Sequence, residues 1–226
     1  MSKKYILFVV MLICVLIITG CQKEKTKEVA GGWETVLSNQ TQMLDDETLA
    51  VFEKATENYN EMDLELVAFL AKQVVSGDNY MFLAKDNGDK NPYKIVVIYK
   101  NLQGQVKIIY VNDFDYTEYV NENIKGNAEA LSGGWNVVST GKPIMLDQSI
   151  QSAFDKATET LIEISLNPIA VLGKQIVSGT NYAILCYGRI TESSLYSIYL
   201  ITLYEDLNGK AEIVSQAYVN LSDYNK

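Results

Sequence analysis

The side chains that most often carry catalysis are scarce in this 226-residue sequence, which contains no histidine and three cysteines. Without histidine, hydroxyl and thiol groups lack their commonest activating base, and there is neither a Gly-x-Ser-x-Gly elbow nor a glycine-rich phosphate loop. Cys186 lies in an apolar run, which is typical of a small core residue. Asp and Asn cluster at 86–89 and 206–208, but their spacing favours hairpin turns over a calcium loop. The sequence therefore predicts a protein that is not an enzyme and that binds no metal or cofactor.

Two stretches of the chain share one sharp turn. Residues 68–80 read AFLAKQVVSGDNY and residues 170–182 read AVLGKQIVSGTNY, which places Gln175 102 positions after Gln73 (175 − 73). In both, a strand-like apolar run breaks at Ser-Gly, where glycine can adopt a positive φ without steric cost. The pattern predicts a tight hairpin in each stretch. The residues expected at the turns and tips are Val75 and Gly77, and Val177 and Gly179.

Other landmarks repeat in the same register, which indicates two copies of one small domain. The segment KATE occurs at 54–57 and again at 156–159, and each copy begins with a Gly-Gly-Trp segment at the same spacing. After the turn the spacing becomes 105, as between Leu102 and Leu207 (207 − 102). This change predicts an insertion in the loop at 189–194.

Each copy is expected to fold as a short strand, a helix and a four-stranded antiparallel meander, which is an α+β unit with the helix on one face of the sheet. The predicted strands are 64–76, 79–86, 93–101 and 105–112, and 169–178, 181–190, 195–204 and 210–219.

Helical periodicity places one apolar stripe in each copy against the sheet. The stripe residues are Val51, Phe52, Ala55 and Tyr59, and Ile150, Ala153, Phe154, Ala157 and Leu161. Asp45 or Asp46, and Asp147, are the predicted N-caps. The opposite face, with Lys54 and Lys156, is interpreted as solvated surface.

The pattern Gln-x-Val-x-Gly followed by Asn-Tyr resembles the first inhibitory hairpin of the cystatin family, and the order of elements is similar to the cystatin fold. The resemblance spans both repeats. It implies two tandem cystatin-like domains that reversibly block papain-like cysteine proteases with a wedge formed by an N-terminal glycine segment and two hairpin loops. The protease would come from a host, a competitor or the same cell. The protease-binding residues implied are Gly31, Gly32, Gln73, Val74, Val75, Ser76, Gly77 and Leu102, and Gly133, Gly134, Gln175, Ile176, Val177, Ser178, Gly179 and Leu207.

The second hairpin loop departs from the family, because Leu102 and Leu207 stand where cystatins usually carry Pro-Trp. Leucine buries less area than tryptophan, so this loop is expected to contribute less affinity. The alternative hypothesis is a non-inhibitory cell-surface interaction module that uses the same fold as a scaffold.

The N-terminus predicts export and anchoring. Lys3 and Lys4 precede an apolar run at 5–18, which is shorter than the about 20 residues that span a bilayer and fits a signal peptide. The segment ITGC, which ends at Cys21, resembles the bacterial lipoprotein box, in which this cysteine becomes lipidated. The protein is therefore expected to be lipid-anchored to the bacterial cell membrane or the outer membrane, facing outward or into the periplasm.

The predicted organisation has five parts. They are a signal peptide (1–20), a lipidated tether (21–30), domain 1 (31–119), a linker (120–132) and domain 2 (133–226). Removal of the signal peptide changes the formal charge from −9 to −11 (−9 − 2), which disfavours nucleic acid as a partner. Domain 2 would stand farther from the membrane and is expected to be the more accessible inhibitory unit.

Overall fold

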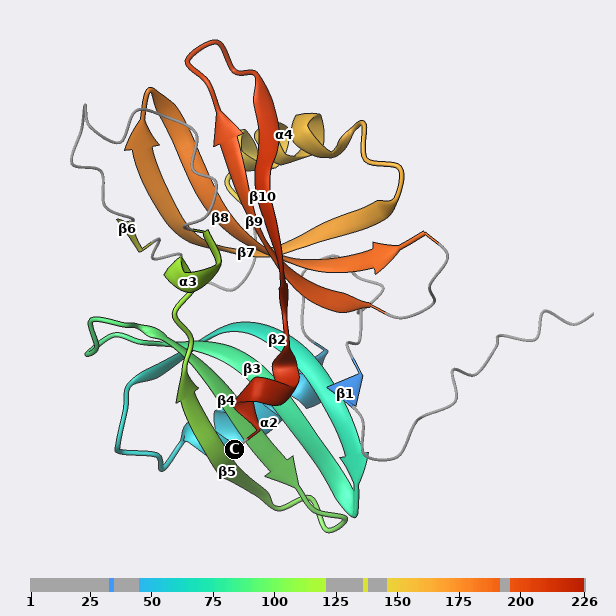
Figure 1. The fold of residues 1–226 in the computed structure, drawn as a ribbon. Helices are drawn as coiled ribbons and strands as arrows, with labels where there is room; N and C mark the ends of the chain where they lie inside the picture. The colour runs from blue at the N-terminus through green and yellow to red at the C-terminus, as the bar shows by residue number, and fades with distance from the viewer. Residues whose placement is uncertain (1–32, 35–44, 121–135, 138–145, 192–195, 226) are drawn as a thin grey trace, which may run out of the picture.

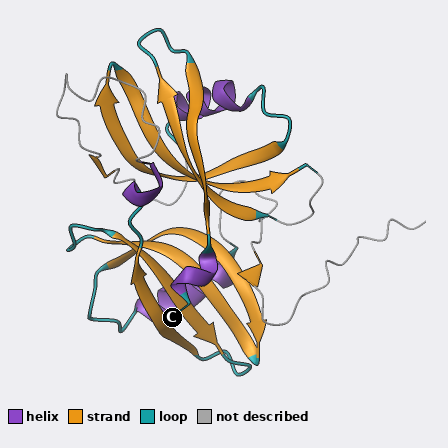
Figure 2. Cartoon of the chain, in the orientation of Figure 1, coloured by secondary structure: helices purple, strands orange, loops and turns teal. Residues whose placement is uncertain are grey.

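The computed structural model describes residues 33–34, 45–120, 136–137, 146–191 and 196–225. Within these residues the chain forms two antiparallel sheets, each with four long strands and a two-residue edge strand (Figure 1). The strand order is β1-β2-β3-β4-β5 in the first repeat and β10-β9-β8-β7-β6 in the second. One longer helix accompanies each sheet (Figure 2), so the predicted α+β class is confirmed.

The first repeat comprises β1 (Trp33–Glu34), α2 (Asp46–Thr56), β2 (Leu64–Val75), β3 (Gly77–Asp86), β4 (Tyr93–Lys100), β5 (Val106–Asp113) and the short helix α3 (Thr117–Val120). The second comprises β6 (Asn136–Val137), α4 (Gln148–Thr158), β7 (Ile164–Val177), β8 (Gly179–Ile190), β9 (Ser197–Glu205), β10 (Ala211–Val219) and the 3-10 helix η1 (Leu221–Tyr224). None of the helices in the described part of the chain is long and apolar enough to cross a membrane.

The predicted strands are close to the observed ones, with two corrections in the second repeat. β7 begins at Ile164 rather than at 169, because Pro168 is accommodated opposite Cys186 beside a bulge, a position where a missing N–H is tolerated. The predicted insertion at 189–194 instead lengthens a hairpin. β8 has 12 residues against 10 in β3, and β9 has 9 against 8 in β4.

The two helices begin where the sequence predicts. Asp45 accepts a hydrogen bond from the Thr48 N–H at 2.7 Å, and Asp147 accepts one from the Ser149 N–H at 2.8 Å. Both predicted stripes are too long. α2 ends at Thr56, before Tyr59, and α4 ends at Thr158, before Leu161, which is 37% exposed.

Each helix covers one face of its own sheet with an apolar core. In the first repeat, Val51 and Phe52 of α2 pack in one cluster with alternate residues of β3, and the Phe52 ring meets the Phe82 ring edge to face at 5.3 Å. Phe154 of α4 is 3% exposed and lies in the corresponding cluster of the second repeat. The expectation that both phenylalanines lie against a sheet is therefore confirmed.

The opposite faces of the two sheets line a single shared core. Its buried residues come from both repeats and alternate with those that face the helices. Those on the central strands are Met81, Leu83, Ile95 and Val97, and Ala183, Leu185, Ile198 and Leu200. Hydrogen bonds cross the core. The Tyr93 hydroxyl donates to the Leu172 carbonyl oxygen at 2.9 Å, and the Tyr187 hydroxyl donates to the Phe69 carbonyl oxygen. The repeats therefore share one hydrophobic interior.

The C-terminal segment of each repeat also packs in this shared region. α3 contacts β9 and β10 of the second repeat, and it includes Val120, which the sequence placed at the start of the linker. In η1, the centre of the Tyr224 ring lies 5.8 Å from that of the Phe114 ring. The backbone carbonyl oxygen of Tyr224 accepts a hydrogen bond from Asn112 Nδ2 at 2.9 Å. The hydroxyl groups of Tyr119 and Tyr224 lie 3.1 Å apart. These are corresponding residues, 105 positions apart (224 − 119), so the two repeats meet in a pseudo-symmetric way.

Candidate functional site

The Ser-Gly turn forms the tight hairpin that the sequence predicts. Val75 and Gly77 stand opposite each other across β2 and β3, and Val177 and Gly179 do the same across β7 and β8. Gly77 has a φ of 125° and Gly179 a φ of 130°, a region that disfavours residues with a Cβ.

The glycines are also needed for space. A Cβ on Gly77 would lie 2.5 Å from the Lys100 carbonyl oxygen, and one on Gly179 would lie 2.4 Å from the Glu205 carbonyl oxygen. The hairpin therefore requires glycine for its shape, whatever it binds.

The second hairpin of each repeat lies beside the first. The Tyr99 hydroxyl donates to the Ser76 carbonyl oxygen at 2.6 Å, and the Tyr204 hydroxyl donates to the Ser178 carbonyl oxygen at the same distance. We call the paired turns tip 1 and tip 2. Tip 1 comprises residues 74–77 and 101–105, and tip 2 comprises residues 176–179 and 206–210. The structure thus brings together the two hairpin loops that the sequence assigned to one site.

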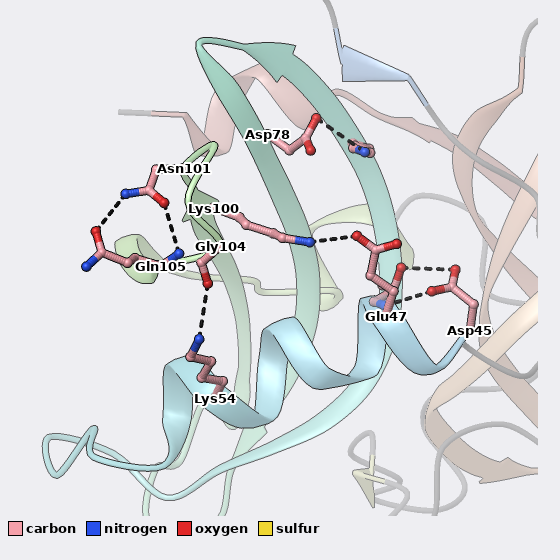
Figure 3. A network of polar contacts seen from close by, with 10 residues as sticks. Asp45, Glu47, Lys54, Asp78, Lys100, Asn101, Gly104 and Gln105 are labelled. Carbon is pink, nitrogen blue, oxygen red and sulfur yellow. Dashed lines mark hydrogen bonds and ion pairs between the residues drawn. The ribbon is translucent and has the colours of Figure 1, made fainter.

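The second hairpin owes its shape to a side chain at its first residue. Asn101 Oδ1 accepts hydrogen bonds from the N–H group of Gln103 at 3.0 Å and from that of Gln105 at 2.9 Å, the second of which is drawn in Figure 3. In tip 2 Asp206 Oδ1 accepts the equivalent bonds from the N–H groups of Asn208 and Lys210, at 2.8 and 2.9 Å. The Asp206 carboxylate therefore holds the turn through backbone N–H groups, and the hydrogen bond from the Lys210 N–H lowers its pKa.

The helix also holds this hairpin through a lysine that sequence reasoning assigned to solvated surface. Lys54 Nζ donates to the Gly104 carbonyl oxygen at 3.1 Å (Figure 3), and Lys156 Nζ donates to the Gly209 carbonyl oxygen at 3.0 Å. That assignment was incomplete, because both lysines tie a tip to its helix. The available signal was their recurrence within the repeated KATE segment.

The glutamines of the repeated motif each pair with an asparagine on the neighbouring strand. Gln73 is 8% exposed, and its Oε1 accepts a hydrogen bond from Asn79 Nδ2 at 2.6 Å. Gln175 is half-buried and accepts the same bond from Asn181 at 2.8 Å. The pairing joins the two strands of each hairpin just below its turn. Both the glutamine and the asparagine recur in the two repeats, but the sequence alone did not predict that they bind each other.

Both tips expose apolar side chains. In tip 1 Val75 is 41% and Leu102 is 81% exposed. In tip 2 Ile176 is 46% and Leu207 is 85% exposed, whereas Val177, which was expected to project, is half-buried. Ser76 and Ser178 are exposed, and Val74 is half-buried. Each tip therefore presents one aliphatic side chain from each of its two hairpins.

The edge strand of each sheet runs beside the same hairpin. Trp33 of β1 stands opposite Gln73, and Asn136 of β6 stands opposite Lys174. Because the pairing is antiparallel, the N-terminal ends of β1 and β6 face the tips of their repeats. The predicted contact residues Gly31, Gly32, Gly133 and Gly134, and the lipidation candidate Cys21, lie outside the described residues.

The charges beside the two tips differ. Below tip 1, Lys72 Nζ lies 3.2 Å from Asp78 and Lys100 Nζ lies 2.6 Å from Glu47 (Figure 3). The hydrogen bond from Lys100 lowers the pKa of Glu47. In the second repeat the positions of Asp78 and Lys100 hold Thr180 and Glu205, so neither ion pair is repeated beside tip 2.

Neither tip carries a nucleophile with an activating base. Cys186 is fully buried, and burial raises the pKa of its thiol, so it behaves as the core residue that the sequence predicts.

No protein-family model matches the chain, and no curated protein is significantly similar to it. What the tips present is a preformed edge with exposed aliphatic side chains.

Proposed function

We propose that each repeat is a cystatin-like domain and that the protein reversibly inhibits papain-like cysteine proteases without covalent chemistry. One observation carries the proposal. Two hairpins in each repeat are hydrogen-bonded side by side at the end of the sheet where the edge strand enters, and both expose an aliphatic side chain. A wedge that enters a protease cleft needs this arrangement.

The hydrogen bonds within the tips support binding by a rigid edge. The turn glycine, the Asn101 or Asp206 side chain and the helix lysine each restrict a tip before any partner arrives. A preorganised edge loses little conformational entropy on binding, so more of the burial energy appears as affinity. The second hairpin would contribute to the affinity through a leucine, which buries less apolar area than an aromatic side chain.

The proposed location follows from the N-terminal sequence. A lipid on Cys21 would hold the protein on the bacterial cell membrane or outer membrane, and Trp33 of β1 would follow after 12 residues (33 − 21). At about 3.5 Å per residue this tether reaches at most ~42 Å. The protease partner would then be met at the cell surface or in the periplasm.

A second candidate function is a surface interaction module without protease inhibition. The Gln73–Asn79 and Gln175–Asn181 pairs favour it, because they give the glutamines of the motif a purely structural role. The steric need for the turn glycines does the same. Inhibition therefore depends on the exposed aliphatic residues rather than on the whole motif.

The test is steady-state inhibition of a papain-like protease by residues 22–226, compared with the double variant Leu102→Ala and Leu207→Ala. Each substitution removes three carbon atoms, so about 0.8 kcal/mol per methylene predicts a loss of up to ~2.4 kcal/mol, or ~50-fold weaker inhibition. Ile162→Ala is the matched control, because Ile162 is 86% exposed but lies outside both tips.

Competitive inhibition that weakens in the double variant and persists in the control is the expected result. An absence of inhibition of several such proteases at micromolar concentration would refute the proposal and leave the interaction module. A Gly179→Glu variant is less informative, because its side chain would disturb the hairpin itself.

A further inference from the structure

The two tips lie at opposite ends of the molecule. Figure 1 shows the turns that join β2 to β3 and β4 to β5 at the lower end, and the turns that join β7 to β8 and β9 to β10 at the upper end. This arrangement follows from the way the repeats pack, with the sheet faces opposite the helices turned toward each other.

Packing between the repeats leaves both tips open. Two of the cross-repeat hydrogen bonds start from Tyr93, the first residue of β4, and from Tyr187, near the end of β8, and both residues are distant from the turns. With the whole chain present, Leu102 is still 81% and Leu207 still 85% exposed. Neither tip therefore has to be uncovered before it can bind a partner.

The shared core also fixes the two tips relative to each other. Gly173 of β7 allows Tyr116 to approach so closely that a Cβ there would lie 2.4 Å from its hydroxyl oxygen. A close-packed contact of this kind leaves little room for the sheets to slide. The tips thus behave as two separate sites on one rigid body, rather than as two domains on a flexible linker.

We propose that the protein binds two partner molecules at the same time, one at each tip. The inference rests on the proposed function, in which each partner is a papain-like cysteine protease. Because the tips point in opposite directions, one bound protease does not block the other. The sites are also unequal, since the Lys72–Asp78 and Lys100–Glu47 pairs lie beside tip 1 and neither pair is repeated beside tip 2. Two dissociation constants are therefore expected.

The experiment measures how many protease molecules one chain binds. Residues 22–226 are titrated with papain whose active-site cysteine has been alkylated, and the mass of the complex is measured by light scattering after gel filtration. One variant carries Val75→Asp and Leu102→Asp in tip 1, and another carries Ile176→Asp and Leu207→Asp in tip 2. Ile162→Asp, an equally exposed site outside the tips, is the matched control. Circular dichroism of each variant checks that it has folded.

The expected result is two proteases per chain for the wild type and the control, one for each tip variant, and none for a variant that carries all four tip substitutions. If the wild type binds one protease and a single tip variant abolishes binding, one tip acts alone, and the inference fails while the proposed function stands. If the wild type binds one protease and both tip variants also bind one, the tips exclude each other and the inference fails again. If the wild type binds none, both proposals are refuted.

Discussion

Leu221→Ala tests whether the two repeats unfold as one unit. Leu221 is the first residue of η1, is 7% exposed, and packs in the core that contains residues of both repeats. Its truncation removes three carbon atoms, worth about 2.4 kcal/mol at ~0.8 kcal/mol each, and the cavity adds to this. We therefore expect a loss of about 3 kcal/mol in the free energy of unfolding.

The assay uses the only two tryptophans of the chain, Trp33 and Trp135, which fall in different repeats. Trp33→Phe and Trp135→Phe each leave one fluorescent reporter, so that urea unfolding of each repeat is followed separately. With an m-value of about 2–3 kcal/mol per molar urea, the loss shifts the midpoint by about 1 M. Both reporters should show the same midpoint and move together.

The exposed Leu207→Ala serves as a control for the same chemical change, and its effect on stability should stay within about 0.5 kcal/mol. The reasoning is refuted if the two reporters give separate unfolding transitions and Leu221→Ala shifts only the midpoint that Trp135 reports. The repeats would then be independent domains, and the rigid placement of the tips would lose its basis.

Acid should loosen tip 2 more than tip 1. The lowered pKa of Asp206 means that its stabilisation is present above the unfolded pKa of about 3.9 and is lost as the pH falls through the folded value, whereas Asn101 does not titrate. Amide exchange at Gly209 relative to Gly104 should therefore rise below pH ~4, and Asp206→Asn should abolish this rise; an unchanged ratio would contradict the role of the carboxylate. Anchoring should also select one tip, because β1 ties the tether to tip 1. When a chain of residues 21–226 is coupled through Cys21 to maleimide lipid in vesicles, with the other remaining thiol buried, it should bind one protease instead of two, and retention of two would show that tip 1 clears the bilayer.

Much of the architecture is encoded locally and was predictable. The Ser-Gly break identifies both hairpins, because the positive φ at Gly77 and Gly179 is a property of a few consecutive residues. Asp45 and Asp147 cap their helices for the same reason. The limits of the helices were less certain, as the exposed Leu161 shows, because one apolar residue at helical spacing does not extend a helix.

The roles of side chains that meet across the sheet were not predictable in this way. Gln73 meets Asn79 only because β2 and β3 pair in one particular register. Lys54 reaches Gly104 only because α2 crosses the sheet near the second turn, 50 residues farther along the chain. Both contacts depend on which segments lie side by side in the folded protein, and the hydrophobic periodicity of the sequence does not give this.

The sequence by itself determined two repeats, their order of elements and the paired turns that form the candidate tips. It also held a sign of the shared core, because β4 reads YKIVVIYK without regular alternation, as strands buried on both faces do. Only the tertiary structure decided what covers the second face, since the burial of apolar surface is non-directional and does not by itself specify a partner. The answer is the other repeat, and this packing directs tip 1 and tip 2 to opposite ends of the molecule.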